Sequence, residues 1–236
     1  MSRSSKSKKY HPNPKAEVVN LRAYKQKKNL NVLPRNLEQE QYLDLLEDDN
    51  VHVVVAYGKA GTGKSYLACA YAAQKLNSGE IDKIVVTRPN LATDDKDIGY
   101  LKGGLLDKMA PWVAPITDAL QDLGYSKQEL NQMMEDEIIE IVPVAFIRGR
   151  TFKNAVIIGD ETQNLTKKSM LALLTRIGEN SKMILTGDIQ QSDRLDHNGL
   201  NELIARAAHA RGIKILELKE VERHPVIGEI TRLFED

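Results

Sequence analysis

The chain has 236 residues, of which 42% are hydrophobic and 28% charged, and its formal net charge is zero. This length allows one good hydrophobic core with a small appendage, and leaves no room for a second large domain. No apolar run approaches the roughly 18 residues that cross a bilayer, and the polar first residues are unlike a secretory signal. We therefore expect a cytoplasmic protein with no membrane partner.

Positive charge is concentrated at the start of the chain. Residues 1–28 contain nine Lys or Arg and one acid, so this segment carries a net charge of +8 and the remainder −8. We expect residues 1–30 to form a flexible basic arm and residues 31–236 to form the folded domain. Such an arm is suited to neutralising nucleic-acid phosphates; a solvated tail, or an arm docked on an acidic neighbour, are the alternative interpretations.

The first residues of the folded part favour a helix over 37–47, followed by a strand over 51–57 and a helix over 66–76. Further strands are predicted over 83–88, 138–142, 154–160, 182–186 and 213–218. Helices are predicted over 105–123, 127–134, 167–177 and 199–210, with a loop over 90–104 and a short amphipathic segment over 227–234. Strands that alternate with helices indicate a three-layer α/β fold, in which helices cover both faces of a mainly parallel sheet.

Cys69 is the only cysteine and lies between alanines in a predicted helix. It cannot form an internal disulfide, so we expect a buried structural thiol in a reducing compartment. No His or Cys lies at metal-ligand spacing elsewhere, and a zinc site is not expected.

A glycine-rich stretch joins the strand over 51–57 to the helix that follows it, and it matches the phosphate-loop pattern G-x-x-x-x-G-K-[ST] at every fixed position. We expect its backbone N–H groups to surround the phosphates of a nucleotide. Lys64 would reach the β- and γ-phosphates, and the Ser65 hydroxyl would hold Mg²⁺. A glycine-rich turn without a ligand is the alternative interpretation. The predicted cofactor-binding residues are Gly58, Lys59, Ala60, Gly61, Thr62, Gly63, Lys64 and Ser65.

Two later strands end in polar residues that fit the same chemistry. Asp160, at the end of one apolar strand, is predicted to hold Mg²⁺ across from Ser65, and Glu161 to activate the attacking water as a general base. Past the strand over 182–186, Gln191 is predicted to hydrogen-bond the γ-phosphate or that water; an ordinary polar turn is the alternative.

A cation besides Lys64 is usually needed to neutralise the transition state. Arg223 is our first choice for this arginine finger, and Arg176 is the second. A surface charge is the alternative interpretation for each of these arginines.

Several further blocks resemble the ATPase domain of the PhoH family, P-loop proteins related to superfamily 1 helicase cores. The resemblance runs from about Pro34 to Phe234. Gln39-Glu40-Gln41-Tyr42 is similar to the family's Q-x-x-Y, in which the Gln contacts adenine, and Thr87-Arg88-Pro89 matches the motif after the second strand. Blocks that resemble the family's in the same order begin at Gly99, Phe146, Leu174 and Val221. The chain departs from the family at Lys59, at Ser65, at Thr162 and over 192–195, where the last difference affects the loop after Gln191.

The resemblance implies a RecA-like, Mg²⁺-dependent ATPase that uses ATP. A helicase-type motor needs two such lobes, so a neighbouring copy would supply the second wall and Arg223. A head-to-tail contact of this kind can close into a ring, and the resemblance implies a hexamer. RNA or single-stranded DNA would contact Thr87, Arg88 and the loop over 90–104.

Two other functions remain open at this stage. One is an ATP-switched nucleic-acid or protein clamp that does not unwind, and the other is a small-molecule phosphotransferase. A stand-alone domain of this kind is similar to those encoded by bacteriophages, so the expected location is the bacterial cytoplasm, or the host cytoplasm for a phage protein.

Overall fold

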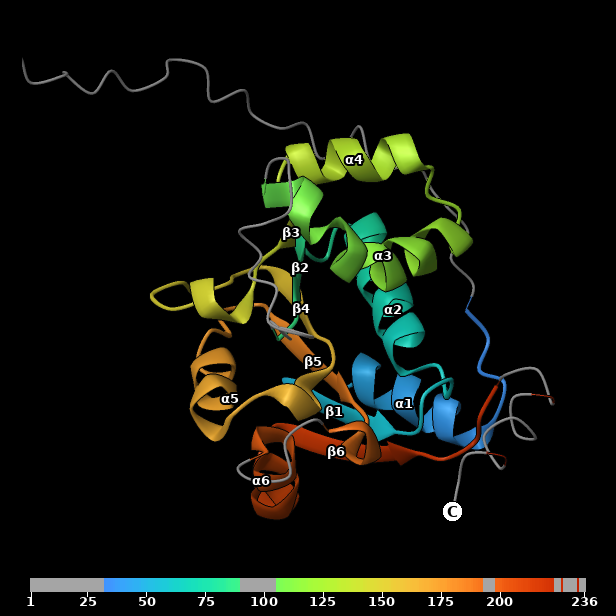
Figure 1. Cartoon of the computed structure of the whole chain (residues 1–236), viewed down its shortest axis with the longest axis vertical. Helices are drawn as coiled ribbons and strands as arrows, with labels where there is room; N and C mark the ends of the chain where they lie inside the picture. The colour runs from blue at the N-terminus through green and yellow to red at the C-terminus, as the bar shows by residue number, and fades with distance from the viewer. Residues whose placement is uncertain (1–31, 90–104, 193–197, 223–225, 227–232, 234–236) are drawn as a thin grey trace, which may run out of the picture.

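The computed structural model describes residues 32–89, 105–192, 198–222, 226 and 233 (Figure 1). Several predicted segments lie outside the described residues: the arm over 1–30, the loop over 90–104, Arg223, and the segment over 227–234 except Leu233. In the part that is described, no helix combines the length and the apolar character that a membrane crossing requires.

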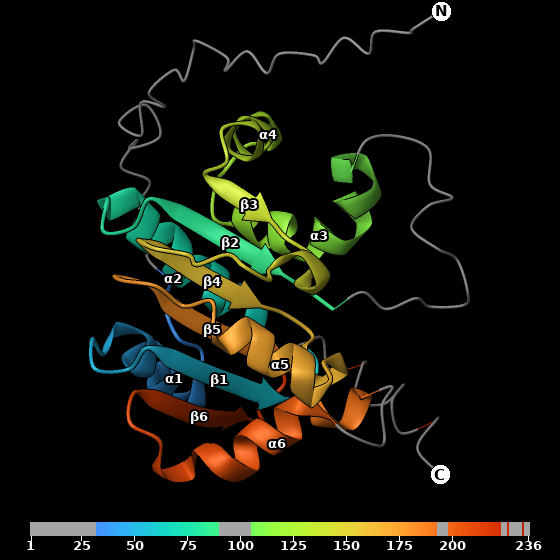
Figure 2. The ribbon, with the colours of Figure 1, turned by 90° about the vertical axis from the view of Figure 1, so that its left-hand side faces the viewer.

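Within the described residues, six strands form one sheet in the order β3-β2-β4-β5-β1-β6. Every pairing between neighbouring strands is parallel, so the arrowheads all point the same way in Figure 2. The carboxyl ends of all the strands therefore lie at one edge of the sheet. The strands are β1 (Val53–Gly58), β2 (Lys83–Thr87), β3 (Ile139–Ile141), β4 (Ala155–Gly159), β5 (Lys182–Gly187) and β6 (Ile213–Leu218).

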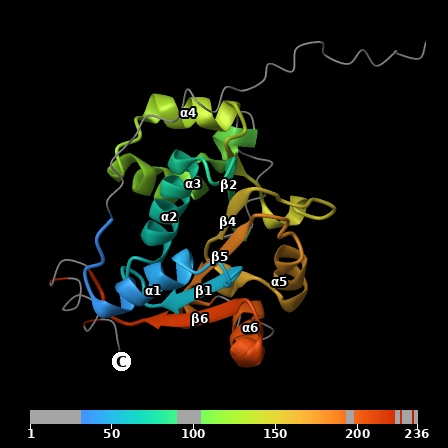
Figure 3. The same ribbon diagram turned by 180° about the vertical axis from the view of Figure 1, so that it is seen from behind.

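Helices cover both faces of this sheet, as Figures 1 and 3 show from opposite sides. One face carries α1 (Leu37–Glu47), α2 (Lys64–Ser78), α3 (Leu105–Asp122) and α4 (Lys127–Glu135). The other face carries α5 (Lys167–Leu174) and α6 (Gly199–Arg206). A capping box opens α4, because Ser126 and Glu129 exchange hydrogen bonds with each other's backbone.

The sheet separates two hydrophobic cores. Alternate residues of β1 point to opposite faces, so Val54 and Ala56 join the core under α1 to α4, whereas Val53 and Val55 join the core under α5 and α6. Because both faces of the central strands are buried, these strands are continuous apolar runs in the sequence. Cys69 is buried in the first core, as predicted, and burial and the nearby Asp160 carboxylate raise the pKa of its thiol.

Most predicted elements agree with the observed ones to within two residues at each end, and the largest differences are at the ends of two helices. The helix predicted over 167–177 ends at Leu174, because the chain then turns to pair with Phe152, whose N–H donates to the Arg176 carbonyl over 2.9 Å. The helix predicted over 199–210 becomes a 3₁₀ turn after Arg206. Three further 3₁₀ turns were not predicted: η3 (Val144–Phe146), η4 (Thr162–Asn164) and η5 (Ile189–Gln191).

The end of β1 approaches β6 closely enough to require glycine. Gly58 has φ +141°, and a Cβ placed there would lie 1.9 Å from the Leu218 carbonyl oxygen. Any side chain at this position must therefore push β6 away from the loop that follows β1.

We predict that Gly58→Ala destabilises the fold by roughly 3 kcal/mol or more, since it combines backbone strain with a clash against the main chain. Gly124→Ala is the matched control, because Gly124 also has a positive φ, +89°, but has nothing within 4 Å of the added Cβ. That control should lose only about 1–2 kcal/mol. Urea unfolding of both variants measures the difference, and equal losses would show that the β6 contact is unimportant.

Candidate nucleotide-binding site

The glycine-rich loop connects β1 to α2 and is closed by its own lysine. The Lys64 ammonium donates to the carbonyls of Gly58 and Lys59, both over 2.7 Å, and to the Thr62 hydroxyl over 3.2 Å. Gly61 and Gly63 have φ of +88° and +89°, which favour glycine and turn the loop back on itself. The helix α2 starts directly at Lys64, so the loop leads into a helix N-terminus, which favours an anion.

Helix α1 supports the loop from outside through Gln39 and Tyr42. The Gln39 amide donates to the Thr62 carbonyl over 3.2 Å and accepts from the Arg35 N–H over 2.9 Å. The Tyr42 hydroxyl donates to the Lys64 carbonyl over 3.4 Å, and burial raises the pKa of Tyr42. The structure thus gives Gln39 a supporting contact that was not predicted, while its predicted contact with adenine stays a prediction.

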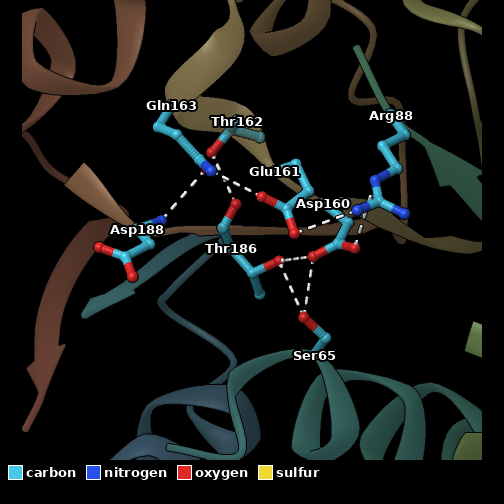
Figure 4. A network of polar contacts seen from close by, with 8 residues as sticks. All are labelled: Ser65, Arg88, Asp160, Glu161, Thr162, Gln163, Thr186 and Asp188. Carbon is cyan, nitrogen blue, oxygen red and sulfur yellow. Dashed lines mark hydrogen bonds and ion pairs between the residues drawn. The ribbon is translucent and has the colours of Figure 1, made fainter. Parts of the chain in front are cut away.

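Ser65 and Asp160, predicted to face each other, are hydrogen-bonded (Figure 4). The Ser65 hydroxyl donates to Asp160 Oδ1 over 2.8 Å, and the Thr186 hydroxyl at the end of β5 donates to the same oxygen over 2.6 Å. A hydroxyl and a carboxylate oxygen are the hard ligands that Mg²⁺ prefers, and one or two protein groups suffice when phosphates and water supply the rest. The pair therefore fits a magnesium ion bound with a nucleotide.

Glu161, the residue after Asp160, has a backbone conformation that is rare for glutamate, with φ +53°. Its Oε1 accepts from Arg88 Nη2 over 3.1 Å, and its Oε2 accepts from Gln163 Nε2 over 2.6 Å. Arg88 Nε also lies 3.9 Å from Asp160 Oδ2. Both acids at the end of β4 are thus linked to one arginine at the end of β2.

Gln163 joins this turn to the end of β5, and the sequence-based prediction missed it. Besides its bond to Glu161, its amide oxygen accepts from the Asp188 N–H over 3.1 Å, and its carbonyl accepts from the Ser192 hydroxyl over 3.2 Å. Gln163 is almost fully buried, with 1% of its surface exposed. The only available sequence signal was its place two residues after Glu161.

A cleft of about 260 Å³ opens where these elements meet. Eight of the predicted residues line it: Ala60, Gly61, Gly63, Lys64, Ser65, Asp160, Glu161 and Gln191, the last from η5. The cleft therefore has a cation, a pair of metal-ligand oxygens and a carboxylate within one small volume, a set that suits binding and hydrolysis of a phosphoanhydride.

The remaining predicted residues lie around or outside this cleft. Thr87 and Arg88 stand at the end of β2, and the buried Thr87 hydroxyl has no hydrogen-bond partner among the described residues. Arg176, the second choice for the finger, donates to the carbonyls of Ala172 and Arg150 and so supports the end of α5. Arg223 is not described, but Glu222 just before it donates its N–H to the Gly61 carbonyl over 2.9 Å.

The segment after β6 is tied to both the loop and α1. The Asn36 amide donates to the Glu222 carboxylate over 2.9 Å. The Glu38 carboxylate accepts from the N–H groups of Lys219 and Glu220, which lowers its pKa. Four backbone or side-chain links thus connect this segment to the first turn of α1 and to the phosphate loop.

A phosphate loop after an interior strand of a parallel sheet, with a Ser–Asp pair beside it, defines the RecA-like P-loop NTPase class. Residues 31–235 match the family described as "PhoH-like protein". The chain belongs to this family, as the resemblance of its motifs implies.

Curated relatives carry the same description. A "PhoH-like protein" of Bacillus subtilis (strain 168) is 37% identical over 216 residues, which cover 89% of this chain and 66% of that protein. "Protein PhoH" of Escherichia coli (strain K12) is 42% identical over 178 residues, covering 74% of this chain and 49% of that protein. The chain thus spans about half to two thirds of the length of these relatives.

Solved structures resemble the chain more loosely. The Hef helicase domain of Pyrococcus furiosus aligns with a TM-score of 0.45 and 11% identity, over 83% of this chain and 39% of that one. The Pif1 helicase of Candida albicans aligns with a TM-score of 0.44 and 16% identity, over 86% and 43% of the two chains.

We predict that Thr186→Val raises the Mg²⁺ concentration needed for half-maximal binding of a fluorescent ATP analogue by roughly 10-fold or more, as expected for loss of a group that orients a metal ligand. The physical reason is that Asp160 Oδ1 loses a buried hydroxyl donor. Thr186→Ser, which keeps the hydroxyl, is the control and should bind almost normally. An unchanged Mg²⁺ requirement in Thr186→Val would show that this hydroxyl does not orient Asp160.

Proposed function

We propose that the chain is a Mg²⁺-dependent ATPase that converts ATP to ADP and phosphate. The observation that carries the proposal is the convergence of Lys64, the Ser65–Asp160 pair and Glu161 on one cleft. Membership of the PhoH-like family supports it.

Each residue has a distinct role in this proposal. The Lys64 ammonium, which donates to carbonyls of its own loop, transfers its hydrogen bonds to the β- and γ-phosphate oxygens. Ser65 and Asp160 hold Mg²⁺, which when bound neutralises charge on the phosphates. Glu161 accepts the proton of the attacking water, and Gln191 hydrogen-bonds the γ-phosphate or the water.

We further propose that the protein acts with RNA or single-stranded DNA in the cytoplasm. Arg88 at the carboxyl end of β2 and the nine basic residues of the arm support a nucleic-acid partner. The described residues contain a single nucleotide-binding lobe. Completion of the cleft by Arg223 of a neighbouring copy, in a ring of the hexameric kind, is part of this proposal.

A clamp that binds nucleic acid under control of ATP, without strand separation, is the second candidate. It is favoured by the state of Glu161, since both of its carboxylate oxygens already accept hydrogen bonds within the chain. Steady ATP hydrolysis without unwinding of a duplex that carries a single-stranded end identifies the clamp, whereas ATP-dependent separation identifies the motor.

We predict that Glu161→Gln retains ATP binding but lowers the hydrolysis rate by roughly 10²-fold or more, because it removes the proton acceptor. Lys64→Ala should instead lose ATP binding, because it removes the cation that pairs with the phosphates. Equilibrium binding of a fluorescent ATP analogue and release of inorganic phosphate measure the two effects. Wild-type protein without affinity for ATP at millimolar Mg²⁺ would refute the proposed function, and normal turnover in Glu161→Gln would remove the assigned base.

We also predict that mixing Arg223→Ala with Lys64→Ala protein restores ATPase activity that neither variant has alone. A mixed interface pairs an intact phosphate loop from one copy with an intact arginine from the other. Phosphate release across a series of mixing ratios, with native mass spectrometry to establish mixed assembly, tests this. Mixed assemblies that remain inactive at every ratio would rule out Arg223 as a finger supplied by the neighbour.

A further inference from the structure

Glu161 is held by two donors of different character. Gln163 is neutral, almost fully buried, and fixed by the Asp188 N–H that its amide oxygen accepts. Arg88 is charged, and 26% of its side chain is exposed. The first contact is therefore part of the folded core, whereas the second is an ion pair that a competing anion from solvent can reach.

A second hollow lies beside the nucleotide cleft, on the side of Arg88. It has a volume of about 510 Å³, and its lining includes Arg88, Gln163, Asn164 and Gln190. Glu161 and Gln191 line both this hollow and the nucleotide cleft. A ligand in the hollow thus contacts the residues predicted to activate water and to hydrogen-bond the γ-phosphate.

The hollow continues along the carboxyl edge of the sheet. Asn164 also lines a third hollow of about 410 Å³, together with Pro89 and Arg148. Amide and arginine side chains thus line this edge of the sheet, and the third hollow has no acidic residue in its lining. Such a lining suits the phosphodiesters of a nucleic-acid strand rather than a cation. The planar guanidinium of Arg88 is the group that best matches a phosphate, because it can donate two parallel hydrogen bonds.

We propose that Arg88 is a positioning residue that restrains Glu161 until a phosphate of single-stranded nucleic acid binds in the hollow of Arg88, Asn164 and Gln190. The phosphate takes the guanidinium as its partner, and Glu161 Oε1 is released to accept a hydrogen bond from water. The inference rests on the proposed ATPase function and adds the regulation of that site by its nucleic-acid partner.

Gln163 keeps Glu161 in position for catalysis after Arg88 has moved away. When Arg88 leaves, Gln163 still holds Oε2, so the carboxylate keeps its orientation toward the cleft instead of rotating freely. With Arg88 in place, the guanidinium and the proton of the attacking water compete for the same oxygen. Bound nucleic acid therefore raises the rate of hydrolysis.

The test compares wild-type protein with Arg88→Gln, and with Arg206→Gln as the matched control. Arg206 also pairs with a glutamate, Glu202, but lies on α6 away from both hollows. In Arg88→Gln we expect the ATPase rate without nucleic acid to rise several-fold, and stimulation by oligouridylate or oligothymidylate to disappear. In wild type and in Arg206→Gln, at least one of the two oligonucleotides should raise the ATPase rate several-fold. Which one does so shows whether the protein responds to RNA or to single-stranded DNA.

A binding measurement without ATP provides an independent readout. Fluorescence anisotropy of the labelled oligonucleotide should show weaker binding to Arg88→Gln, with the slope of log affinity against log salt reduced by about one. Thermal unfolding checks that Arg88→Gln is folded. Should it not fold, Arg88→Lys takes its place, with retained charge and partial loss of stimulation expected because lysine lacks the guanidinium fork.

Three outcomes would overturn the inference while the ATPase proposal stands. One is Arg88→Gln protein with the wild-type rate and intact stimulation. Another is an Arg88→Gln rate that falls both with and without oligonucleotide, which would mean that Arg88 orients Glu161 for catalysis. The third is active wild-type protein that neither oligonucleotide stimulates. Wild-type protein without any ATP hydrolysis refutes the proposed function, and the inference with it.

Discussion

The site depends on the parallel pairing of β4, β5 and β1. Met183 of β5 pairs with Val53 of β1 on one side and with Ile157 of β4 on the other. The three parallel strands therefore end at the same edge of the sheet. Only this arrangement brings the loop after β1 within hydrogen-bonding distance of Asp160 after β4, although Ser65 and Asp160 are 95 residues apart in the chain. The two hydrophobic cores on either side hold the strands in that order.

At this edge, hydroxyl and amide groups hold Asp160 and Glu161 in addition to the ion pairs of Arg88. Asp160 accepts from two hydroxyls, and the end of β5 is joined to η4 by Thr162, whose hydroxyl donates to the Thr186 carbonyl over 2.8 Å. Neutral donors keep their geometry when charges nearby change, since they do not depend on a counterion.

Features that depend on neighbouring residues in the chain could be predicted from the sequence. The phosphate-loop pattern and the apolar strands each depend on residues adjacent in the chain, and each was predicted. The contacts of Gln163, Thr186 and Arg88 depend on which strands are neighbours, and no strand order was predicted. The 3₁₀ turns η3, η4 and η5 are too short to produce a periodic pattern. The end of α5 was placed too late because its stop is a tertiary pairing with Phe152 instead of a local breaker.

The hydrogen bond between Gly61 and Glu222 connects the phosphate loop to the segment after β6. The Gly61 carbonyl holds the Glu222 N–H, and the Glu222 side chain in turn holds Asn36, whose own carboxamide oxygen caps α1. The loop backbone is thus connected both to the start of α1 and to the segment that follows β6. These segments, distant in the sequence, are joined through the hydrogen bonds of one residue, Glu222.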